Sequence, residues 1–131
     1  MAIVGGGPAG LATALFLAQA DPSLTERILV LEKETYPRDK ICGGAIGARG
    51  DDLLASIGVE VDVPSAEVSV LSVRTEEGET RARVSRLGRV VRRIEYDHAL
   101  AKIAQGRGIR ILERAAVHGL SVFEKRVELE S

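Results

Sequence analysis

The chain opens with Met1-Ala2-Ile3-Val4-Gly5-Gly6-Gly7-Pro8-Ala9-Gly10, a short apolar strand that runs directly into a glycine-rich turn. In the spacing Gly5-x-Gly7-x-x-Gly10, the first glycine permits a tight turn, the second lets a diphosphate approach the backbone, and the third lets a helix pack closely on the strand. Pro8 and Ala9 then begin a helix, whose free N–H groups and positive dipole end attract an anion. The stretch predicts a strand, turn and helix that bind a dinucleotide.

The residues that follow support this interpretation, although glycines at these offsets also occur in ordinary tight turns. An alanine-rich apolar helix is predicted over residues 11–18, in which Ala14 keeps the face toward the sheet small. A second apolar strand, residues 28–31, ends in Glu32, where a carboxylate accepts the ribose hydroxyls of a dinucleotide. The alternative for Glu32 is a solvated strand end. A carboxylate at this place repels a 2′-phosphate, which argues against NADP, but the motif alone does not separate FAD from NAD.

Length and composition are those of one globular domain. The chain has 131 residues, of which 45% are hydrophobic and 28% charged, and its net charge of −1 provides no overall attraction to nucleic acid or an anionic membrane. The first helix, about a dozen residues, is shorter than the roughly 20 residues that span a bilayer. A single cysteine fits a reducing compartment, so a cytoplasmic protein is expected. Because a flavin enzyme needs further chain to enclose the ring and the substrate, we expect an incomplete, N-terminal part of a longer protein.

The middle of the chain is predicted to be irregular at first. Residues 33–50 are rich in glycine, proline and charged residues and indicate a long loop, which in a compact domain is usually functional. A short helix over residues 51–56 follows, with Leu53, Leu54 and Ile57 as its apolar face.

The second half alternates between strands and one helix. Alternating apolar residues predict an antiparallel hairpin inserted at residues 66–92. Asp97 is expected to cap a helix that ends near Gln105, and residues 109–112 are expected to form another strand. A final hairpin is expected to turn around Lys125. The fold class is therefore α/β, a Rossmann-like unit with an inserted antiparallel β segment.

Two other features have unremarkable explanations. The arginines that crowd the second hairpin strand fit a solvated strand face, and an aromatic content of 3% gives little support for base stacking, so no nucleic-acid partner is expected. His98 and His118 are predicted to be surface or packing residues. Together with Cys42 they lack the spacing of a metal site, and no metal is expected. The arginines that crowd the second hairpin strand and the residues just after it are Arg81, Arg83, Arg86, Arg89, Arg92 and Arg93.

Four motifs, in this order along the chain, resemble the N-terminal third of the geranylgeranyl reductase family. That family lies within the flavoproteins related to para-hydroxybenzoate hydroxylase, a group that also includes flavin-dependent halogenases. The third motif discriminates best, because many flavin and nicotinamide enzymes share the first two. The motifs are Gly5-Gly6-Gly7-Pro8-Ala9-Gly10, Glu32-Lys33, Pro37-Arg38-x-Lys40-x-Cys42-Gly43-Gly44 and Arg93-x-x-Tyr96-Asp97-x-x-Leu100.

The resemblance implies FAD as cofactor and assigns residues to it. The glycine turn takes the pyrophosphate, Glu32 takes the adenosine ribose, residues 40–43 lie along the flavin, Arg93 reaches the cofactor, and the backbone near residues 116–117 borders the adenine. The full set that the resemblance implies is Gly5, Gly7, Pro8, Ala9, Gly10, Glu32, Lys33, Lys40, Ile41, Cys42, Gly43, Arg93, Ala116 and Val117.

The implied activity is hydride transfer from reduced flavin to an isoprenoid or related organic substrate, and a lipid substrate would bring the protein to the membrane periphery. Cys42 is the candidate catalytic residue beside the ring, with a pKa lowered by Arg38 and Lys40, and the alternative is a small residue packed in a turn. The family's later FAD and substrate segments have no counterpart, so this chain alone is not expected to catalyse the reaction. Residues 66–92 would belong to the substrate domain.

Two other functions remain open at this point. A monooxygenase or halogenase of the same superfamily would share this N-terminal part, because its substrate motifs would lie further along the chain. A nucleotide-binding fragment without catalytic activity would hold the adenosine half of FAD and pair with another copy through exposed strand edges.

Overall fold

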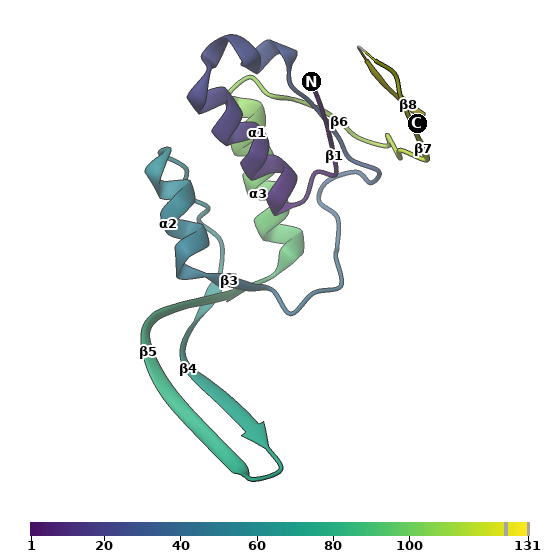
Figure 1. Cartoon of the computed structure of the whole chain (residues 1–131). Helices are drawn as coiled ribbons and strands as arrows, with labels where there is room; N and C mark the ends of the chain where they lie inside the picture. The colour runs from purple at the N-terminus through teal and green to yellow at the C-terminus, as the bar shows by residue number, and fades with distance from the viewer. Residues whose placement is uncertain (125, 131) are drawn as a thin grey trace.

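A parallel sheet of three short strands, two from the start of the chain and one from near its end, organises the main body of the molecule (Figure 1). The computed structural model of the chain describes residues 1–124 and 126–130. Strands β1 (Ala2–Val4), β2 (Leu29–Leu31) and β6 (Arg110–Leu112) lie in the order β1-β2-β6. Ile3 pairs with Val30, and Val30 with Ile111. This order and the parallel pairing confirm the α/β class expected from the first 32 residues.

Two helices pack against each other beside this sheet. Helix α1 (Pro8–Ala20) begins at the predicted proline and is followed by a 3₁₀ helix, η1 (Pro22–Arg27). Helix α3 (Arg93–Gly106) lies alongside α1 (Figure 1). The core contains the side chains that these elements turn toward one another, and the largest of them are Leu11, Leu15, Ile28, Val30, Tyr96 and Leu100.

The first and third glycines of the turn have the structural roles that their spacing predicts. Gly5 has a φ of +100°, a conformation that side-chain-bearing residues rarely adopt. A Cβ on Gly10 would overlap the carbonyl oxygen of Gly5, so only glycine allows α1 to lie this close to the turn. Gly6, the unconstrained position of the motif, is also restricted, because a Cβ there would overlap the Tyr36 hydroxyl, which donates a hydrogen bond to the Gly6 carbonyl.

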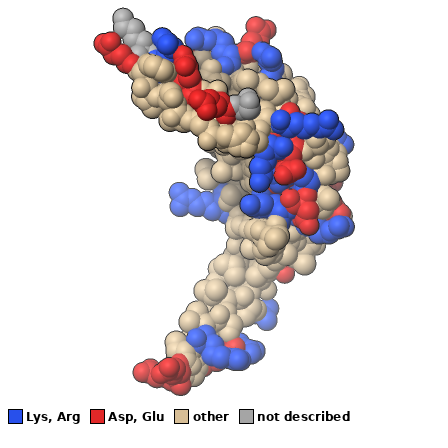
Figure 2. Space-filling view, turned by 90° about the vertical axis from the view of Figure 1, so that its right-hand side faces the viewer, with Lys and Arg blue, Asp and Glu red and all other residues tan. Residues whose placement is uncertain are grey.

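A second, antiparallel sheet extends away from this body as a long arm (Figure 1). It is ordered β3-β5-β4, from β3 (Ala45–Gly47), β4 (Ser65–Thr75) and β5 (Gly78–Val91). The predicted hairpin is thus confirmed. Its outer part is exposed on both faces, and Figure 2 shows acidic side chains at the tip with basic side chains beside them.

The predicted loop and short helix of residues 33–56 need correction. The loop is shorter than expected because β3 pairs with β5, Ala45 opposite Val90, a long-range contact that no local pattern reveals. Helix α2 (Ala48–Ser56) therefore starts three residues before position 51. Leu54 is buried in the core, but Leu53 is 48% exposed and does not belong to the apolar face.

The start of α3 was also predicted wrongly. The helix begins at Arg93, and Asp97 lies within it, where its side chain is fully buried and forms ion pairs rather than a cap. An aspartate that follows a polar stretch is typical of a helix start, but here two arginines satisfy its carboxylate inside the fold.

The C-terminal hairpin is confirmed as β7 (Gly119–Val122) paired with β8 (Val127–Glu130). Its predicted turn at Lys125 lies outside the described residues. Within the part of the chain that the structure describes, no helix is long and apolar enough to cross a membrane.

Candidate functional site

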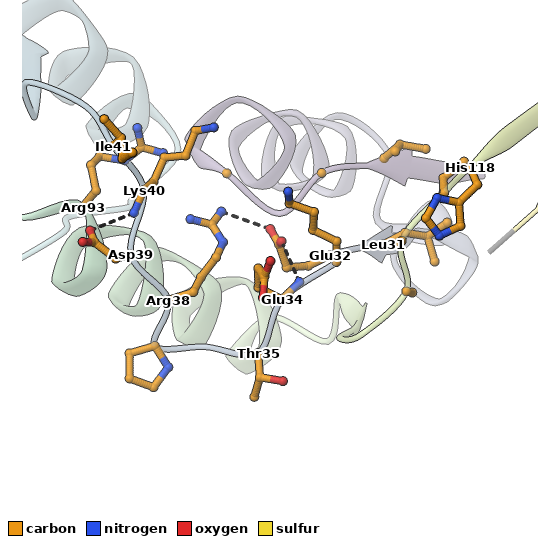
Figure 3. Close-up of a pocket in the computed structure, with 18 residues that line it drawn as sticks. Leu31, Glu32, Glu34, Thr35, Arg38, Asp39, Lys40, Ile41, Arg93 and His118 are labelled. Carbon is orange, nitrogen blue, oxygen red and sulfur yellow. Dashed lines mark hydrogen bonds and ion pairs between the residues drawn. The ribbon is translucent and has the colours of Figure 1, made fainter.

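A groove of about 1020 Å³ lies where the parallel strands β1 and β2 end (Figure 3). In open α/β sheets, ligands bind outside the carboxyl ends of the strands, so the groove is at the place where the fold predicts a ligand. The chain contributes to it from the glycine turn, from the segment after β2, from the start of α3 and from the segment after β6. The lining residues are Val4, Gly5, Gly7, residues 31–35 and 37–41, Arg93 and residues 115–118.

Most of the site residues that the sequence suggested meet at this groove. Five predicted residues do not line it. Pro8, Ala9 and Gly10 form the first turn of α1 behind Gly7, and Cys42 and Gly43 follow Ile41 at the end of the groove. The predicted residues that line the groove are Gly5, Gly7, Glu32, Lys33, Lys40, Ile41, Arg93, Ala116 and Val117.

The N-terminus of α1 is open to an anion at Gly7. Gly7 is the N-cap, with φ −79° and ψ 179°, and among the described residues no side chain caps the first turn. A Cβ on Gly7 would lie 3.7 Å from Nη2 of Arg93 and 3.8 Å from Nη2 of Arg38. Two guanidinium groups therefore flank the helix end, where free N–H groups already favour negative charge.

Glu32 is buried rather than being a solvated strand end. Its Oε2 accepts hydrogen bonds from Gly6 N–H and Arg38, both at 3.0 Å, and its Oε1 accepts one from Glu34 N–H at 3.1 Å (Figure 3). Burial raises the pKa of Glu32, but the backbone N–H groups and the Arg38 guanidinium outweigh it and hold the pKa below its usual value. The carboxylate thus ties the loop after β2 to the glycine turn while it lines the groove.

We expect Glu32→Gln to lower the free energy of unfolding by about 2 kcal/mol at pH 7, because it removes a buried acceptor of charge-assisted hydrogen bonds. The sign of the pH dependence follows from the lowered pKa: the stabilisation is present above the unfolded-state pKa of Glu32 and is lost as the pH falls through the folded-state value. Urea unfolding from pH 7 to pH 3 should show the two proteins converging at acid pH. A constant difference in the free energy of unfolding across that pH range would contradict a stabilising role for the ionised Glu32 carboxylate.

Asp97 connects two arginines of the groove, and neither Asp97 nor Arg38 was among the predicted site residues. Arg93 donates from Nε to Oδ1 at 2.7 Å and from Nη2 to Oδ2 at 2.8 Å. Arg38 donates from Nη1 to Oδ2 at 2.8 Å. The hydrogen bonds to Asp97 raise the pKa of Arg93. The spacing of Arg93 and Asp97, one helical turn apart, was the available signal, but placing the helix start at Asp97 hid it.

Cys42 is exposed at the end of the groove. Its pKa is lowered, first by a hydrogen bond from Gly44 N–H, at 3.4 Å from Sγ, and second by Arg93. The predicted direction is therefore confirmed, but the cation that lowers the pKa is Arg93 rather than the predicted Arg38 and Lys40. The catalytic role of Cys42 remains a prediction.

The histidines and the arginine run behave largely as expected. His98 is half-buried and stacks on Tyr36, with ring centroids 6.3 Å apart, whereas His118 lines the groove, a place that the sequence did not indicate. Most of the arginines of residues 81–93 are exposed. Arg89 differs, because it makes a two-point ion pair with Asp51. Within the described part of the chain, no group of three or more His, Cys, Asp or Glu residues is placed to hold a metal ion.

Comparisons with known proteins agree with this geometry. A family model of NAD(P)-binding Rossmann-like domains matches residues 3–51. The chain is 26% identical over 133 residues to conditioned medium factor receptor 1 of Dictyostelium discoideum, and 30% identical over 125 residues to a menaquinone reductase of Mycobacterium tuberculosis. These alignments include 89% and 88% of this chain, but 25% and 30% of the two relatives.

Solved structures share the fold over almost the whole chain. The flavin-dependent halogenase CmlS superposes with a TM-score of 0.74 at 25% identity, covering 98% of this chain and 25% of the halogenase. A geranylgeranyl bacteriochlorophyll reductase-like protein from Thermoplasma acidophilum superposes with a TM-score of 0.71 at 20% identity, covering 96% of this chain and 32% of that protein. The chain spans about a quarter to a third of the length of these proteins. It therefore has the Rossmann-like dinucleotide-binding fold found in flavin-dependent halogenases and oxidoreductases.

Proposed function

We propose that the groove binds FAD and that the chain is the FAD-binding part of a flavin-dependent oxidoreductase. The observation that carries this proposal is the continuity of the groove: one cavity is lined by the glycine turn, by Glu32, by residues 115–118 and by Lys40 and Ile41. A diphosphate fits at Gly7, where the helix end and two guanidinium groups meet, and a ribose fits beside Glu32. The adenine would then lie near residues 115–118 and the flavin ring toward residues 40–43.

Among flavoenzymes, we propose a reductase similar to geranylgeranyl reductases. Bound reduced FAD would supply the hydride for reduction of a carbon–carbon double bond of an isoprenoid or related substrate, with the accompanying proton taken from solvent, and the protein would position the ring. The support is the Pro37–Gly44 motif at the flavin end of the groove, together with the similarity to a menaquinone reductase and to a geranylgeranyl bacteriochlorophyll reductase-like protein. The second candidate is a halogenase, which the match to CmlS over 98% of this chain favours.

The arm would serve the substrate side of such an enzyme. Its outer strands carry exposed apolar side chains, Leu71, Val73 and Val84, and an isolated two-stranded hairpin has little stability of its own in water. We propose that residues 66–92 pack within a substrate domain of a longer protein, for which the relatives' greater length is the support.

Calorimetric titration of the 131-residue chain with FAD, ADP and FMN tests the cofactor. We expect FAD to bind more tightly than ADP, because the flavin adds contacts, and FMN to bind weakly, because it lacks the adenosine diphosphate that the turn recognises. Glu32→Arg should weaken the binding of FAD and of ADP by about tenfold or more, since it removes the carboxylate that accepts hydrogen bonds from the ribose. Tight FMN binding, or equal FAD binding by the variant, would contradict the assigned groove.

Anaerobic reoxidation of the dithionite-reduced FAD complex separates the candidate reactions. Reoxidation on addition of geranylgeranyl diphosphate alone supports the reductase. Formation of a chlorinated aromatic acceptor only after oxygen and chloride are added, with oxygen as the oxidant of both the reduced flavin and the chloride, supports the halogenase instead. If neither occurs, the 131-residue chain by itself holds the cofactor without catalysing either reaction, and the same comparison is then made with the longer protein.

A further inference from the structure

One buried carboxylate holds two arginines beside the anion-binding turn. Asp97 is fully buried, and its two oxygens accept three hydrogen bonds from Arg93 and Arg38 at 2.7–2.8 Å. The Nη2 atoms of both arginines lie 3.7 and 3.8 Å from the position that a Cβ on Gly7 would occupy. Gly7 is the residue whose missing side chain leaves room for a diphosphate.

These arginines have donors left for a ligand. A guanidinium group has five N–H donors, and the bonds to Asp97 and Glu32 use only some of them. The Nε of Arg38 is buried and has no hydrogen-bond partner among the described residues. The side chains of Arg38 and Arg93 are 11% and 14% exposed, so both are already ordered and largely desolvated before a ligand arrives.

Charge in this cluster is balanced without a ligand. Two carboxylates, of Glu32 and Asp97, face two guanidinium groups. Without Asp97 the arginines would lose the contacts that hold them at Gly7, and two buried cations would be left with one carboxylate between them. Asp97 therefore sets the position of the positive groups rather than contributing a contact of its own to the groove.

We propose that Asp97 is the positioning residue of the diphosphate site, and that Arg38 joins Arg93 and the start of α1 in binding the diphosphate. The inference rests on the proposed binding of a dinucleotide in the groove. It adds Arg38 as a residue that contacts the diphosphate. It also adds Asp97 as a residue that holds Arg38 and Arg93 in place without contacting the diphosphate itself.

The chain contains a matched control pair outside the groove. Arg89 and Asp51 also form a two-point ion pair, with distances of 2.8 and 3.0 Å, but neither residue lines the groove. Asp51→Asn therefore makes the same chemical change as Asp97→Asn at another two-point arginine pair, one in which the carboxylate has a single arginine partner and is 30% exposed. A general effect of losing an ion pair would appear in both variants.

The test compares ADP with adenosine, which lacks the phosphates. ADP affinity is measured by calorimetry, and adenosine affinity by displacement of FAD. In Asp97→Asn and in Arg38→Gln we expect ADP to bind about tenfold or more weakly, because charge-assisted hydrogen bonds to the diphosphate are lost. Adenosine should bind as to the wild type, within about twofold, because Glu32, the residue assigned to the ribose, keeps its hydrogen bonds from the Gly6 and Glu34 N–H groups when Arg38 is replaced. Asp51→Asn should leave the affinities for ADP and for adenosine unchanged.

The ratio of the two affinities decides the outcome. A loosened fold would weaken the binding of both ligands and leave the ratio of ADP to adenosine affinity unchanged. An unchanged ratio in Arg38→Gln therefore overturns the proposal. This test remains available if Asp97→Asn does not give a folded far-UV spectrum. Wild-type chain that binds neither FAD nor ADP would refute the proposed function as well. Wild-type binding with unchanged ratios in the variants refutes only the roles of Asp97 and Arg38.

Discussion

Gly7→Asp is expected to stabilise the free chain by about 1 kcal/mol and to weaken ADP binding about a hundredfold or more. The two effects have one cause. Aspartate is a preferred N-cap, and Gly7 already has the extended conformation of that position at the start of α1. Its carboxylate would lie near the guanidinium groups of Arg38 and Arg93. It would therefore occupy, and repel a ligand from, the place assigned to the diphosphate.

Urea unfolding and ADP calorimetry on the same preparation measure the two effects. Gly7→Asn is the matched control, because it has nearly the same shape and also caps a helix but carries no charge. It should lose less ADP affinity than Gly7→Asp, and the difference between the two variants reports the electrostatic part. If Gly7→Asp binds ADP like the wild type, the anion site does not lie at the start of α1.

Gly10→Ala is expected to lower the free energy of unfolding by about 3 kcal/mol, a large effect for one methyl group. The added Cβ would overlap the carbonyl oxygen of Gly5, which is backbone and cannot rotate away as a flexible side chain can. Gly5 has a φ of +100°, so the turn has little freedom to move without leaving the conformation that joins β1 to α1. Either α1 shifts away from the sheet or the turn is distorted, and core contacts are lost.

Gly106→Ala is the control for this substitution. Gly106 is the last residue of α3, and among the described residues a Cβ there would meet nothing within 4 Å beyond its chain neighbours and the helix's own backbone. Alanine has the higher helix propensity, so the change should be neutral or stabilise the chain by up to about 1 kcal/mol. Thermal or urea unfolding compares the two variants directly. Equal changes in the free energy of unfolding at both positions would show that the glycine turn can accommodate a Cβ at position 10.

The first 32 residues determined the nucleotide-binding part of the fold from the sequence alone. Each of their signals is local: an apolar run, glycines at fixed offsets, a proline at a helix start and a carboxylate after the second strand. The structure confirms the resulting strand, turn and helix, and the hairpin of β4 and β5 was predicted for the same reason, because strand alternation is visible within a short window.

Only the tertiary structure decided how the segments far apart in the chain meet. Arg38 and Asp97 are 59 residues apart, and their ion pair exists only once the loop after β2 lies against α3, within which Asp97 is buried. Gly6 is restricted by Tyr36, 30 residues away. The strand β3 exists because β5 pairs with it. Local patterns indicate backbone preference and burial, but the partner of a buried charge is selected only in the folded chain. For this reason Arg93 was among the predicted site residues, whereas Arg38 and the ion pairs through which Asp97 places both arginines beside Gly7 were not.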